Sequence, residues 1–198
     1  MSHFDKRAEG WDKGNTQVSG AKVIADAIRK NIALDSKMQL IDFGTGTGLL
    51  GFDIATSVEK VHGVDTSSKM LAKLEAKNTD ELNIRAYCQD IIKEPLEENF
   101  DGLVSSMTLH HIENLQEFFT TIRNTLTSDG FIAIADLEKE DGTFHSDNAG
   151  VFHFGFDKQE LCRVVEECGF KDIKFETINT IKKPQRDFGV FLLTAKVA

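Results

Sequence analysis

The sequence predicts a doubly wound α/β fold, a three-layer α/β/α arrangement in which helices cover both faces of a mostly parallel sheet. Short apolar runs alternate along the chain with segments of helical periodicity, a pattern typical of strands joined by crossover helices. The last two apolar runs are separated only by residues 181–187, which are too few for a crossover helix, so these runs form an antiparallel hairpin. With 198 residues, 40% of them hydrophobic, residues 1–198 are predicted to form a single domain.

The predicted strands and helices follow one another in regular order. Strands are expected at residues 39–44, 60–65, 83–88, 101–106, 130–136, 172–179 and 188–196. Helices are expected at residues 21–33, 49–57, 69–78, 115–126 and 158–168. Capping residues support these boundaries: Ser67 or Thr66, Asn114 with Glu117, and Asp157 with Glu160 at helix starts, and Gly169 at a helix end.

Charge and cysteine content narrow the classes of partner and compartment. The formal net charge of -9 disfavours nucleic acid and membrane partners, since binding phosphates requires clustered Lys and Arg. Cys88, Cys162 and Cys168 form no CxxC pair, so they are expected to be reduced, buried thiols. The N-terminal residues contain no apolar run typical of a signal peptide or anchor, so a cytoplasmic location is expected. The oligomeric state is not indicated by the sequence.

Glycines are concentrated where the first strand turns into the following helix. Gly44, Gly46 and Gly48 permit backbone conformations that a Cβ atom would penalise, and they let a ligand lie against the main chain. A tight turn without a ligand is the alternative. A dinucleotide-binding turn counted from Gly44 would place its third glycine at position 49, where the chain has Leu49.

Two aspartates indicate the charge of the ligand. Asp42 lies in the strand two residues before the first glycine, where a carboxylate would repel a pyrophosphate and attract a cation such as S-adenosylmethionine. Asp65 ends the second strand, where an acid commonly accepts both hydroxyls of a ribose. Together the two residues favour a cationic adenosine ligand over a dinucleotide.

These motifs resemble those of the class I S-adenosylmethionine-dependent methyltransferases, and the resemblance extends from about Gln39 to the C-terminus. Residues 42–48 resemble the family's acid-x-Gly-x-Gly-x-Gly loop, 64–67 its ribose-binding segment, and 89–91 its adenine-binding segment. Residues 100–112, with the run Leu-His-His-Ile, are similar to the fourth-strand motif of the small-molecule branch, the ubiquinone and menaquinone type. The resemblance implies a Rossmann-like seven-stranded sheet of order 3-2-1-4-5-7-6 with strand 7 antiparallel.

The resemblance also implies S-adenosyl-L-methionine as cofactor and methyl transfer by in-line displacement to a small-molecule acceptor. The residues that it assigns to the cofactor are Asp42, Gly44, Thr45, Gly46, Gly48, Asp65, Thr66, Met70, Asp90, Ile91, Ser106 and Met107. No metal ion is expected. A catalytically inactive protein that binds S-adenosylmethionine or S-adenosylhomocysteine is one alternative. A NAD(P)-dependent oxidoreductase is less favoured, because the only tyrosine, Tyr87, has no lysine four residues later.

His110 is the candidate catalytic base and a candidate acceptor-binding residue. It follows the fourth strand at the edge where the sulfonium is expected, and some plant O-methyltransferases carry a base in a similar Leu-His context. The alternative is a structural imidazole that caps the turn or packs beneath the sheet edge without moving a proton. That alternative is preferred for His111.

Residues 138–156 are longer than a usual connection and are predicted to form a lid on the acceptor side. His145 and His153, which flank part of it, are candidate acceptor-binding residues. Phenylalanines at 152, 154 and 156 would suit a flat or apolar acceptor, and they are equally typical of a short edge strand. A metal site formed by His145, Asp147 and His153 is a less favoured alternative.

Residues 1–33 are predicted to form a helical leader over the cofactor site. The pattern Phe4-Asp5-x-x-Ala8-x-x-Trp11-Asp12 resembles the leader of small-molecule methyltransferases. Trp11, the only tryptophan, is predicted to form a wall of the acceptor site, since its polar, glycine-flanked context does not suit core burial. A helix packed on the sheet is the alternative.

Overall fold

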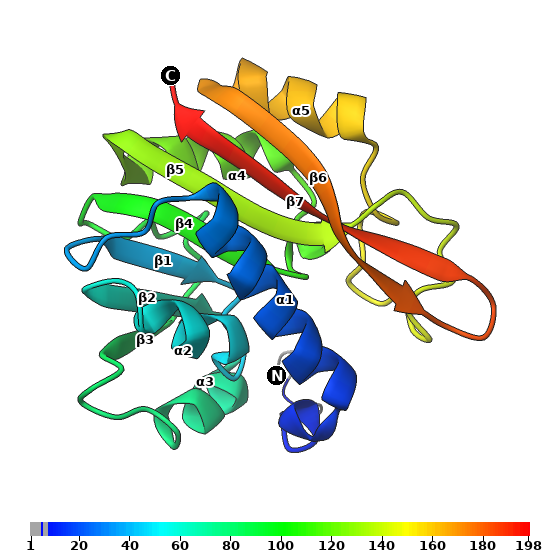
Figure 1. Cartoon of the computed structure of the whole chain (residues 1–198), viewed down its shortest axis with the longest axis horizontal. Coiled ribbons are helices and arrows are strands. Elements are labelled where there is room, and N and C mark those ends of the chain that lie inside the picture. The colour runs from blue at the N-terminus through cyan, green and yellow to red at the C-terminus, as the bar shows by residue number, and fades with distance from the viewer. Residues whose placement is uncertain (1–4, 6–7) are drawn as a thin grey trace.

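The computed structural model describes residue 5 and residues 8–198, which form a sheet covered by helices on both faces (Figure 1). In chain order the elements are η2 (Trp11–Lys13), α1 (Asn15–Asn31), β1 (Gln39–Phe43), α2 (Leu49–Ala55), β2 (Lys60–Asp65), α3 (Ser68–Glu75), β3 (Ile84–Cys88), β4 (Phe100–Ser106), η3 (Leu109–His111), α4 (Leu115–Thr125), β5 (Leu126–Leu137), α5 (Lys158–Glu167), β6 (Phe170–Lys182) and β7 (Asp187–Val197).

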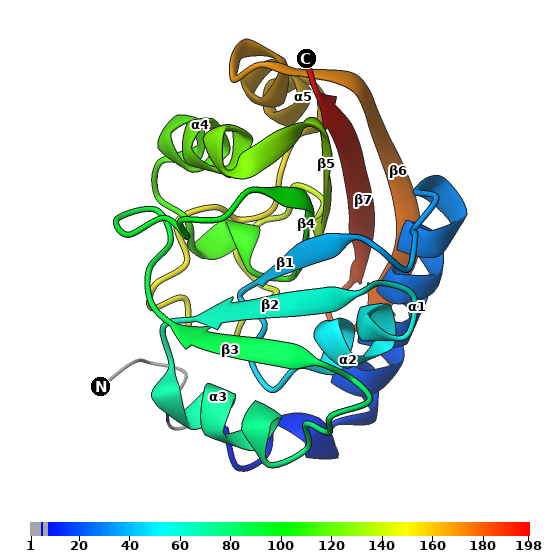
Figure 2. The ribbon, with the colours of Figure 1, turned by 90° about the vertical axis from the view of Figure 1, so that its left-hand side faces the viewer.

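The sheet order is β3-β2-β1-β4-β5-β7-β6, as the resemblance implies. Strand β7 runs antiparallel to both of its neighbours, and the remaining pairs are parallel. Figure 2 shows α1, α2 and α3 on one face of the sheet and α4 and α5 on the other. The predicted doubly wound fold and its C-terminal hairpin are therefore confirmed.

Two apolar layers hold the helices to the sheet. In β1, Leu40 packs in the layer shared with α1, α2 and α3, whereas its neighbour Ile41 packs in the layer shared with α4 and α5. Ile28 of α1 and Phe118 of α4 are fully buried in these layers. Burial of a side chain of this size contributes about 1.5–3 kcal/mol to stability. Because helices fill both faces, a ligand is expected at the carboxyl edge of the parallel strands.

The observed boundaries differ from the predicted ones mainly in length. Helix α1 begins at Asn15 instead of residue 21. The prediction missed its first turns because they are polar, contain Gly20, and start after Gly14 without a side-chain cap. The paired part of β6 extends to Lys182, opposite Asp187 of β7, so the hairpin loop is shorter than expected. Three predicted caps are confirmed: Ser67, Asn114 and Asp157 each accept a hydrogen bond from the first turn of their helix.

The structure also describes the environment of the three cysteines and the length and character of the helices. Cys88, Cys162 and Cys168 are free thiols, but Cys88 is exposed and the other two are half-buried, so the expected burial is wrong. Cys88 is at the end of β3, the edge strand of the sheet, where its side chain is exposed, which its apolar character did not indicate. No helix within the described residues has the length and apolar character needed to span a bilayer.

Candidate functional site

The turn after β1 adopts the backbone conformation that its glycines were predicted to permit. Gly44 has φ 67° and Gly46 has φ 55°, both in the left-handed region that side chains rarely adopt. The backbone N–H groups of Gly44 and Thr45 donate to the carbonyl of Val64 at 2.9 and 3.0 Å, which fixes the turn against β2. A Cβ atom at Gly44 would lie 2.3 Å from the side chain of Thr108. Glycine is therefore required at that position by both backbone and space.

Asp42 is a buried carboxyl group directly beneath this turn. Its Oδ2 atom accepts a 2.6 Å hydrogen bond from the hydroxyl of Thr45. Burial raises the pKa of Asp42 to about 7, and the nearby carboxylate of Asp65 acts in the same direction. A cation placed near Asp42 would oppose both effects and favour its ionised form.

Asp65 joins the end of β2 to the glycine turn. Its Oδ2 atom accepts a 2.9 Å bond from the backbone of Gly46, and its Oδ1 atom accepts a 2.8 Å bond from the backbone of Ser67. Burial raises the pKa of Asp65, while these backbone donors partly offset that effect. Since an ionised carboxylate has about four acceptor sites, Asp65 can also accept from a ligand hydroxyl.

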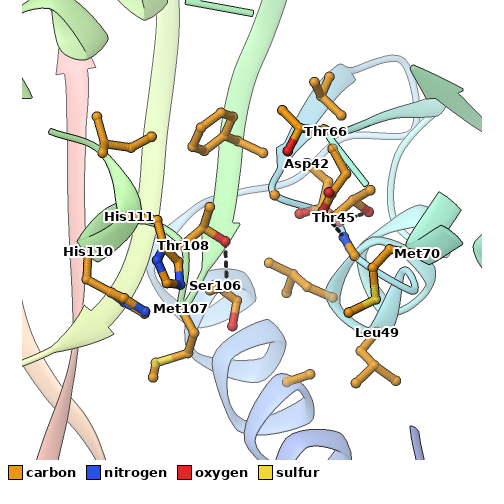
Figure 3. Close-up of a pocket in the computed structure, with 18 of the residues that line it drawn as sticks. Asp42, Thr45, Leu49, Thr66, Met70, Ser106, Met107, Thr108, His110 and His111 are labelled. Carbon is orange, nitrogen blue, oxygen red and sulfur yellow. Dashed lines mark hydrogen bonds between the residues drawn. The ribbon is translucent and has the colours of Figure 1, made fainter. Parts of the chain in front are cut away.

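A cavity of about 1110 Å³ opens along the carboxyl edge of the sheet. Ten of the twelve predicted cofactor residues line it: Asp42, Gly44, Thr45, Gly46, Asp65, Thr66, Met70, Asp90, Ser106 and Met107. Figure 3 shows Asp42, Thr45 and Met70 on one side of the cavity and Ser106, Met107, Thr108 and two histidines on the other. The cavity exceeds the roughly 300–1,000 Å³ of a usual ligand cleft, so it has room for two small ligands.

Two of the predicted cofactor residues do not line the cavity. Ile91 is 2% exposed and belongs to the core, whereas its neighbours Asp90 and Ile92 line the cavity. The motif placed the adjacent residues Asp90 and Ile91 on the ligand, but the turn after β3 directs Ile91 into the core. Gly48 precedes α2 with φ 85°, and its missing Cβ leaves room for Phe52 and Leu74. The predictions for Ile91 and Gly48 are corrected accordingly.

The spacing of the glycines does not by itself exclude a dinucleotide turn. Counted from Gly46, the turn does fit the dinucleotide spacing Gly-x-Gly-x-x-Gly, ending at Gly51. A Cβ atom at Gly51 would lie 2.8 Å from Asp42 Oδ2, so this glycine makes room for the buried acid. The acid, and not the spacing of the glycines, is what distinguishes this turn from a pyrophosphate site.

His110 is a lining residue of the cavity, and it is held by an acid that the sequence did not single out. Its Nδ1 atom lies 2.8 Å from Asp136 Oδ1, and its backbone N–H donates to Asp136 Oδ2 at 3.1 Å. Both side chains are buried, with 1% of His110 and none of Asp136 exposed. The Nε2 atom of His110 is buried and has no hydrogen-bond partner among the residues that the structure describes. Asp136 lies next to the end of β5. An acid at the carboxyl end of a buried strand is a signal that could have identified it as a site residue.

His111 and His145 form a cluster of imidazoles with His110 in the wall of the cavity. The His110 ring lies 4.1 Å from the His111 ring and 4.9 Å from the His145 ring, measured between centroids. Burial lowers the pKa of His145 to about 4, and positive charge on His110, His111 and Lys183 acts in the same direction. His145 is therefore neutral near pH 7, and its Nε2 atom is also buried without a partner.

His153 does not line the cavity, so its predicted contact with an acceptor is withdrawn. Its Nε2 atom lies 2.8 Å from the carbonyl of Ile112, and its ring packs against Phe156. This imidazole fastens the segment after β5 to the segment after η3. Its role in the structure is the positioning of residues 138–156.

Residues 138–156 form an irregular segment at the acceptor end of the cavity, where Phe144, His145 and Phe152 line it. Outside the main sheet, the segment makes one isolated bridge, between Glu138 and Phe156, so the three alternating phenylalanines do not form an edge strand. Phe152 is 53% exposed at the cavity wall, whereas Phe156 belongs to the core. Within the described residues, no group of three His, Cys, Asp or Glu side chains is placed to hold a metal ion.

The β6–β7 hairpin holds this segment in place. Lys183 donates to the carbonyl of Phe144 and lies over its ring. Beside it, Gln185 donates to the carbonyl of Thr143. Lys183, Asn179 and Ile181 also line the cavity, a contribution of the hairpin that the sequence analysis missed.

The N-terminal residues lie beside the glycine turn. Trp11 lines the cavity. Asp12 accepts a 2.5 Å bond from the hydroxyl of Thr47 and a 2.7 Å bond from Lys77, and Asp5 accepts one of 2.7 Å from the hydroxyl of Ser67. Helix α1 packs on the sheet as well, and its residues Gln17, Ala21 and Ile24 line the cavity. Phe4 of the predicted leader lies outside the described residues.

Comparisons with known proteins agree with this architecture. An uncharacterized methyltransferase of Schizosaccharomyces pombe is 29% identical over 173 residues, which cover 78% of this chain and 59% of that protein. The malonyl-[acyl-carrier protein] O-methyltransferase of Bacillus anthracis is 23% identical over 143 residues, which cover 71% of this chain and 53% of that protein. The chain therefore spans little more than half the length of these relatives.

The fold is shared with solved structures as well. Phosphoethanolamine N-methyltransferase 2 of Haemonchus contortus, solved in complex with S-adenosyl-L-methionine, has a TM-score of 0.72 at 16% identity, covering all of this chain and 60% of that one. Residues 34–169 match the family described as methyltransferase domain. Since this match includes β1 to β5, the glycine turn and His110, the chain belongs to the methyltransferase domain family.

Proposed function

We propose that this protein is an S-adenosylmethionine-dependent methyltransferase that acts on a small-molecule acceptor. The observation that carries the proposal is the single cavity that runs from the acidic glycine turn to the imidazole cluster. A methyltransferase must hold a cofactor and an acceptor side by side, and the volume of this cavity suits that requirement.

The charge of the glycine-turn end supports a cationic cofactor. Asp42, Asp65 and Asp90 line this end. S-adenosylmethionine carries an ammonium and a sulfonium, and it has no phosphate that these carboxylates would repel. The cofactor named in the Haemonchus contortus complex is the same molecule.

In this proposal, residues of the glycine turn and of the neighbouring strand ends each bind a different part of the cofactor. Asp42, Gly44, Thr45 and Gly46 hold its amino-acid part, and Asp65 accepts the ribose hydroxyls. Asp90, with Ile92 in place of the predicted Ile91, holds the adenine. The remaining lining residues, Thr66, Met70, Ser106 and Met107, close the cofactor site.

The acceptor occupies the other end of the cavity. Trp11, His110 and His145 form its walls, with Phe144 and Phe152 of residues 138–156 as a lid. A small acceptor is favoured because the site is an inner cavity on a chain of net charge -9, which does not suit nucleic acid. The Bacillus anthracis relative is named for a malonyl-[acyl-carrier protein] acceptor.

The chain has little covalent chemistry to perform. S-adenosylmethionine supplies a methyl group that its sulfonium already activates for in-line displacement. The protein aligns the acceptor and excludes water, which is where most of the rate acceleration in such a reaction arises. Where the acceptor carries a proton, His110 is the residue placed to accept it.

Calorimetry with S-adenosylmethionine and with NADH tests the cofactor. We expect saturable binding of S-adenosylmethionine and none of NADH, and the reverse result would refute the proposal. Incubation with methyl-radiolabelled S-adenosylmethionine and fractions of a cell extract then tests transfer. Label should enter a small-molecule fraction, and tight cofactor binding without any transfer would favour the inactive binding protein.

A further inference from the structure

We propose that Asp136 positions His110 as a base with an unprotonated Nε2 atom, and that the methyl acceptor presents a hydroxyl group to that atom. The inference rests on the proposed function and adds to it the chemical class of the acceptor. Asp136 acts through His110, so it is a positioning residue.

The hydrogen bonds of Asp136 determine which nitrogen of His110 carries the proton. Asp136 Oδ1 accepts from the backbone of Leu137 at 2.7 Å, and Oδ2 accepts from the backbone of His110 at 3.1 Å. Both oxygens therefore act as acceptors, as in an ionised carboxylate. The His110 Nδ1 atom, 2.8 Å from Oδ1, must donate to it. In a neutral imidazole with Nδ1–H, the lone pair is on Nε2.

The Nε2 atom of His110 lacks the partner that a buried polar atom normally has. It is one of two such side-chain atoms within the described residues, and the other is Nε2 of His145. Leaving a buried acceptor unpaired is unfavourable, because its bond to water is lost and not replaced. The two rings are neighbours and both line the cavity, so a group that donates a hydrogen bond there would recover this cost. A group bound at His110 Nε2 would also contact His145, because the two rings lie side by side.

The charges around the cluster favour a hydroxyl over an amine. The ammonium group of Lys183 lies over the ring of Phe144, lines the same cavity as His145 and disfavours positive charge there. An ammonium group would meet the same unfavourable field, whereas an oxygen that becomes negative would be stabilised by it. Asp136, which acts in the opposite direction, is already occupied by three donors.

The reaction then balances without another reactant. The O–H bond of the acceptor breaks and its proton moves to His110 Nε2, while the acceptor oxygen forms a bond to the methyl carbon. The bond between that carbon and sulfur breaks, and its electron pair stays on sulfur. The imidazolium is stabilised by Asp136 until it returns the proton to water.

Nitrogen NMR of histidine imidazoles in the full-length protein tests the positioning role. The chain has six histidines, and two-bond proton–nitrogen correlations distinguish the Nδ1–H and Nε2–H forms. We expect His110 to be the Nδ1–H form, and the Asp136→Asn variant to lose it, because an amide offers only one acceptor oxygen. His62 is the internal control, since it is buried against Tyr87 and Gln39 and should not change. An Nε2–H form of His110 in the unaltered protein would overturn the proposal.

Phenol and anisole at millimolar concentration, added with S-adenosylhomocysteine, test the acceptor class. The two probes differ only in the methyl group on oxygen. We expect phenol, and not anisole, to shift the His110 Nε2 resonance. The variant Asp129→Asn, at an exposed position outside the cavity, should respond as the unaltered protein does. Equal responses to both probes, or none to phenol, would overturn the assignment of a hydroxyl acceptor.

The outcome for His110 separates this inference from the proposed function. If calorimetry finds no binding of S-adenosylmethionine, the proposed function fails first. If the cofactor binds and label is transferred, but His110 has the wrong tautomer or ignores phenol, only the present inference fails.

Discussion

The Oδ2 atom of Asp65 accepts a 2.9 Å hydrogen bond from the backbone N–H of Gly46. This bond connects the end of β2 to the turn after β1, so two strand ends are fixed relative to each other by one carboxylate. A ribose bound at Asp65 would therefore lie against a turn whose position is already set.

Replacing Asp65 with alanine should weaken the binding of S-adenosylmethionine about 10-fold or more, because ribose hydroxyls would be left without an acceptor in a closed site. Isothermal titration calorimetry measures the change. The matched control is Asp80→Ala, which removes an exposed aspartate outside the cavity. An affinity within twofold of the unaltered protein for Asp65→Ala would remove Asp65 from the cofactor site.

The affinity for S-adenosylmethionine should fall as the pH is lowered below about 7, because the pKa of Asp42 is raised to about 7 and a cationic ligand binds its ionised form. Stability should show the opposite trend. The folded state binds more protons at Asp42 than the unfolded state between about pH 4 and 7, so this group's contribution to the free energy of unfolding falls as pH rises through that window.

Calorimetry at pH 6 and pH 8, with denaturant unfolding at the same values, measures both trends of Asp42. The Asp42→Asn variant should bind more weakly and lose both dependences, since its amide does not titrate. An affinity independent of pH in the unaltered protein would show that Asp42 does not contact the cation.

Replacing Gly46 with alanine should abolish most cofactor binding at a small cost in stability. The residue has φ 55°, and the nearest atom to a built Cβ is 4.0 Å away, so the added methyl group would occupy ligand space. Left-handed backbone costs a non-glycine residue about 1–2 kcal/mol. Gly150→Ala is the control, with φ 77° and open space outside the cavity. Both variants should lose similar stability in thermal unfolding, but only Gly46→Ala should lose affinity.

Cofactor binding should change the intrinsic fluorescence of the protein, because Trp11 is the only tryptophan and lines the cavity. A titration with S-adenosylhomocysteine should give a saturable change in emission, with the midpoint shifted to higher concentration in the Asp65→Ala variant. The Trp11→Phe variant should lose the signal and still bind by calorimetry. Constant emission at saturating ligand would exclude Trp11 from the occupied cavity.

Much of the cofactor end could be predicted because its residues follow strand ends in a fixed order. Asp42, Asp65 and Asp90 each come at the end of a parallel strand or directly after it, and such strands end at one edge. Ile91 was placed at the cavity because the motif names adjacent residues, whereas the turn after β3 buries Ile91 between two lining residues, Asp90 and Ile92. Met107 was predicted to line the cavity, but its left-handed φ of 55° has no signal in the sequence.

The acceptor end could be predicted only in part, because it is built from segments far apart in the chain. His110 was expected from its place after β4, but its pairing with Asp136 depends on the register of β4 and β5. Lys183 lines the cavity from the loop of the β6–β7 hairpin, and the paired part of that hairpin is longer than the sequence predicted. The contrast between His145, which lines the cavity, and His153, which does not, depends on the path of an irregular segment.

The ion pair between Arg186 of the hairpin and Asp141 of the lid segment, 3.4 Å apart, has a consequence for how such an enzyme could change its substrate. Residues 138–156 and the hairpin come from different parts of the chain, yet Lys183, Gln185 and Arg186 join them through contacts with residues 141–144. Exchanging both pieces together with those of a relative would transplant an acceptor preference and leave the cofactor machinery untouched. Exchanging either piece alone would break the contacts that give the other its shape.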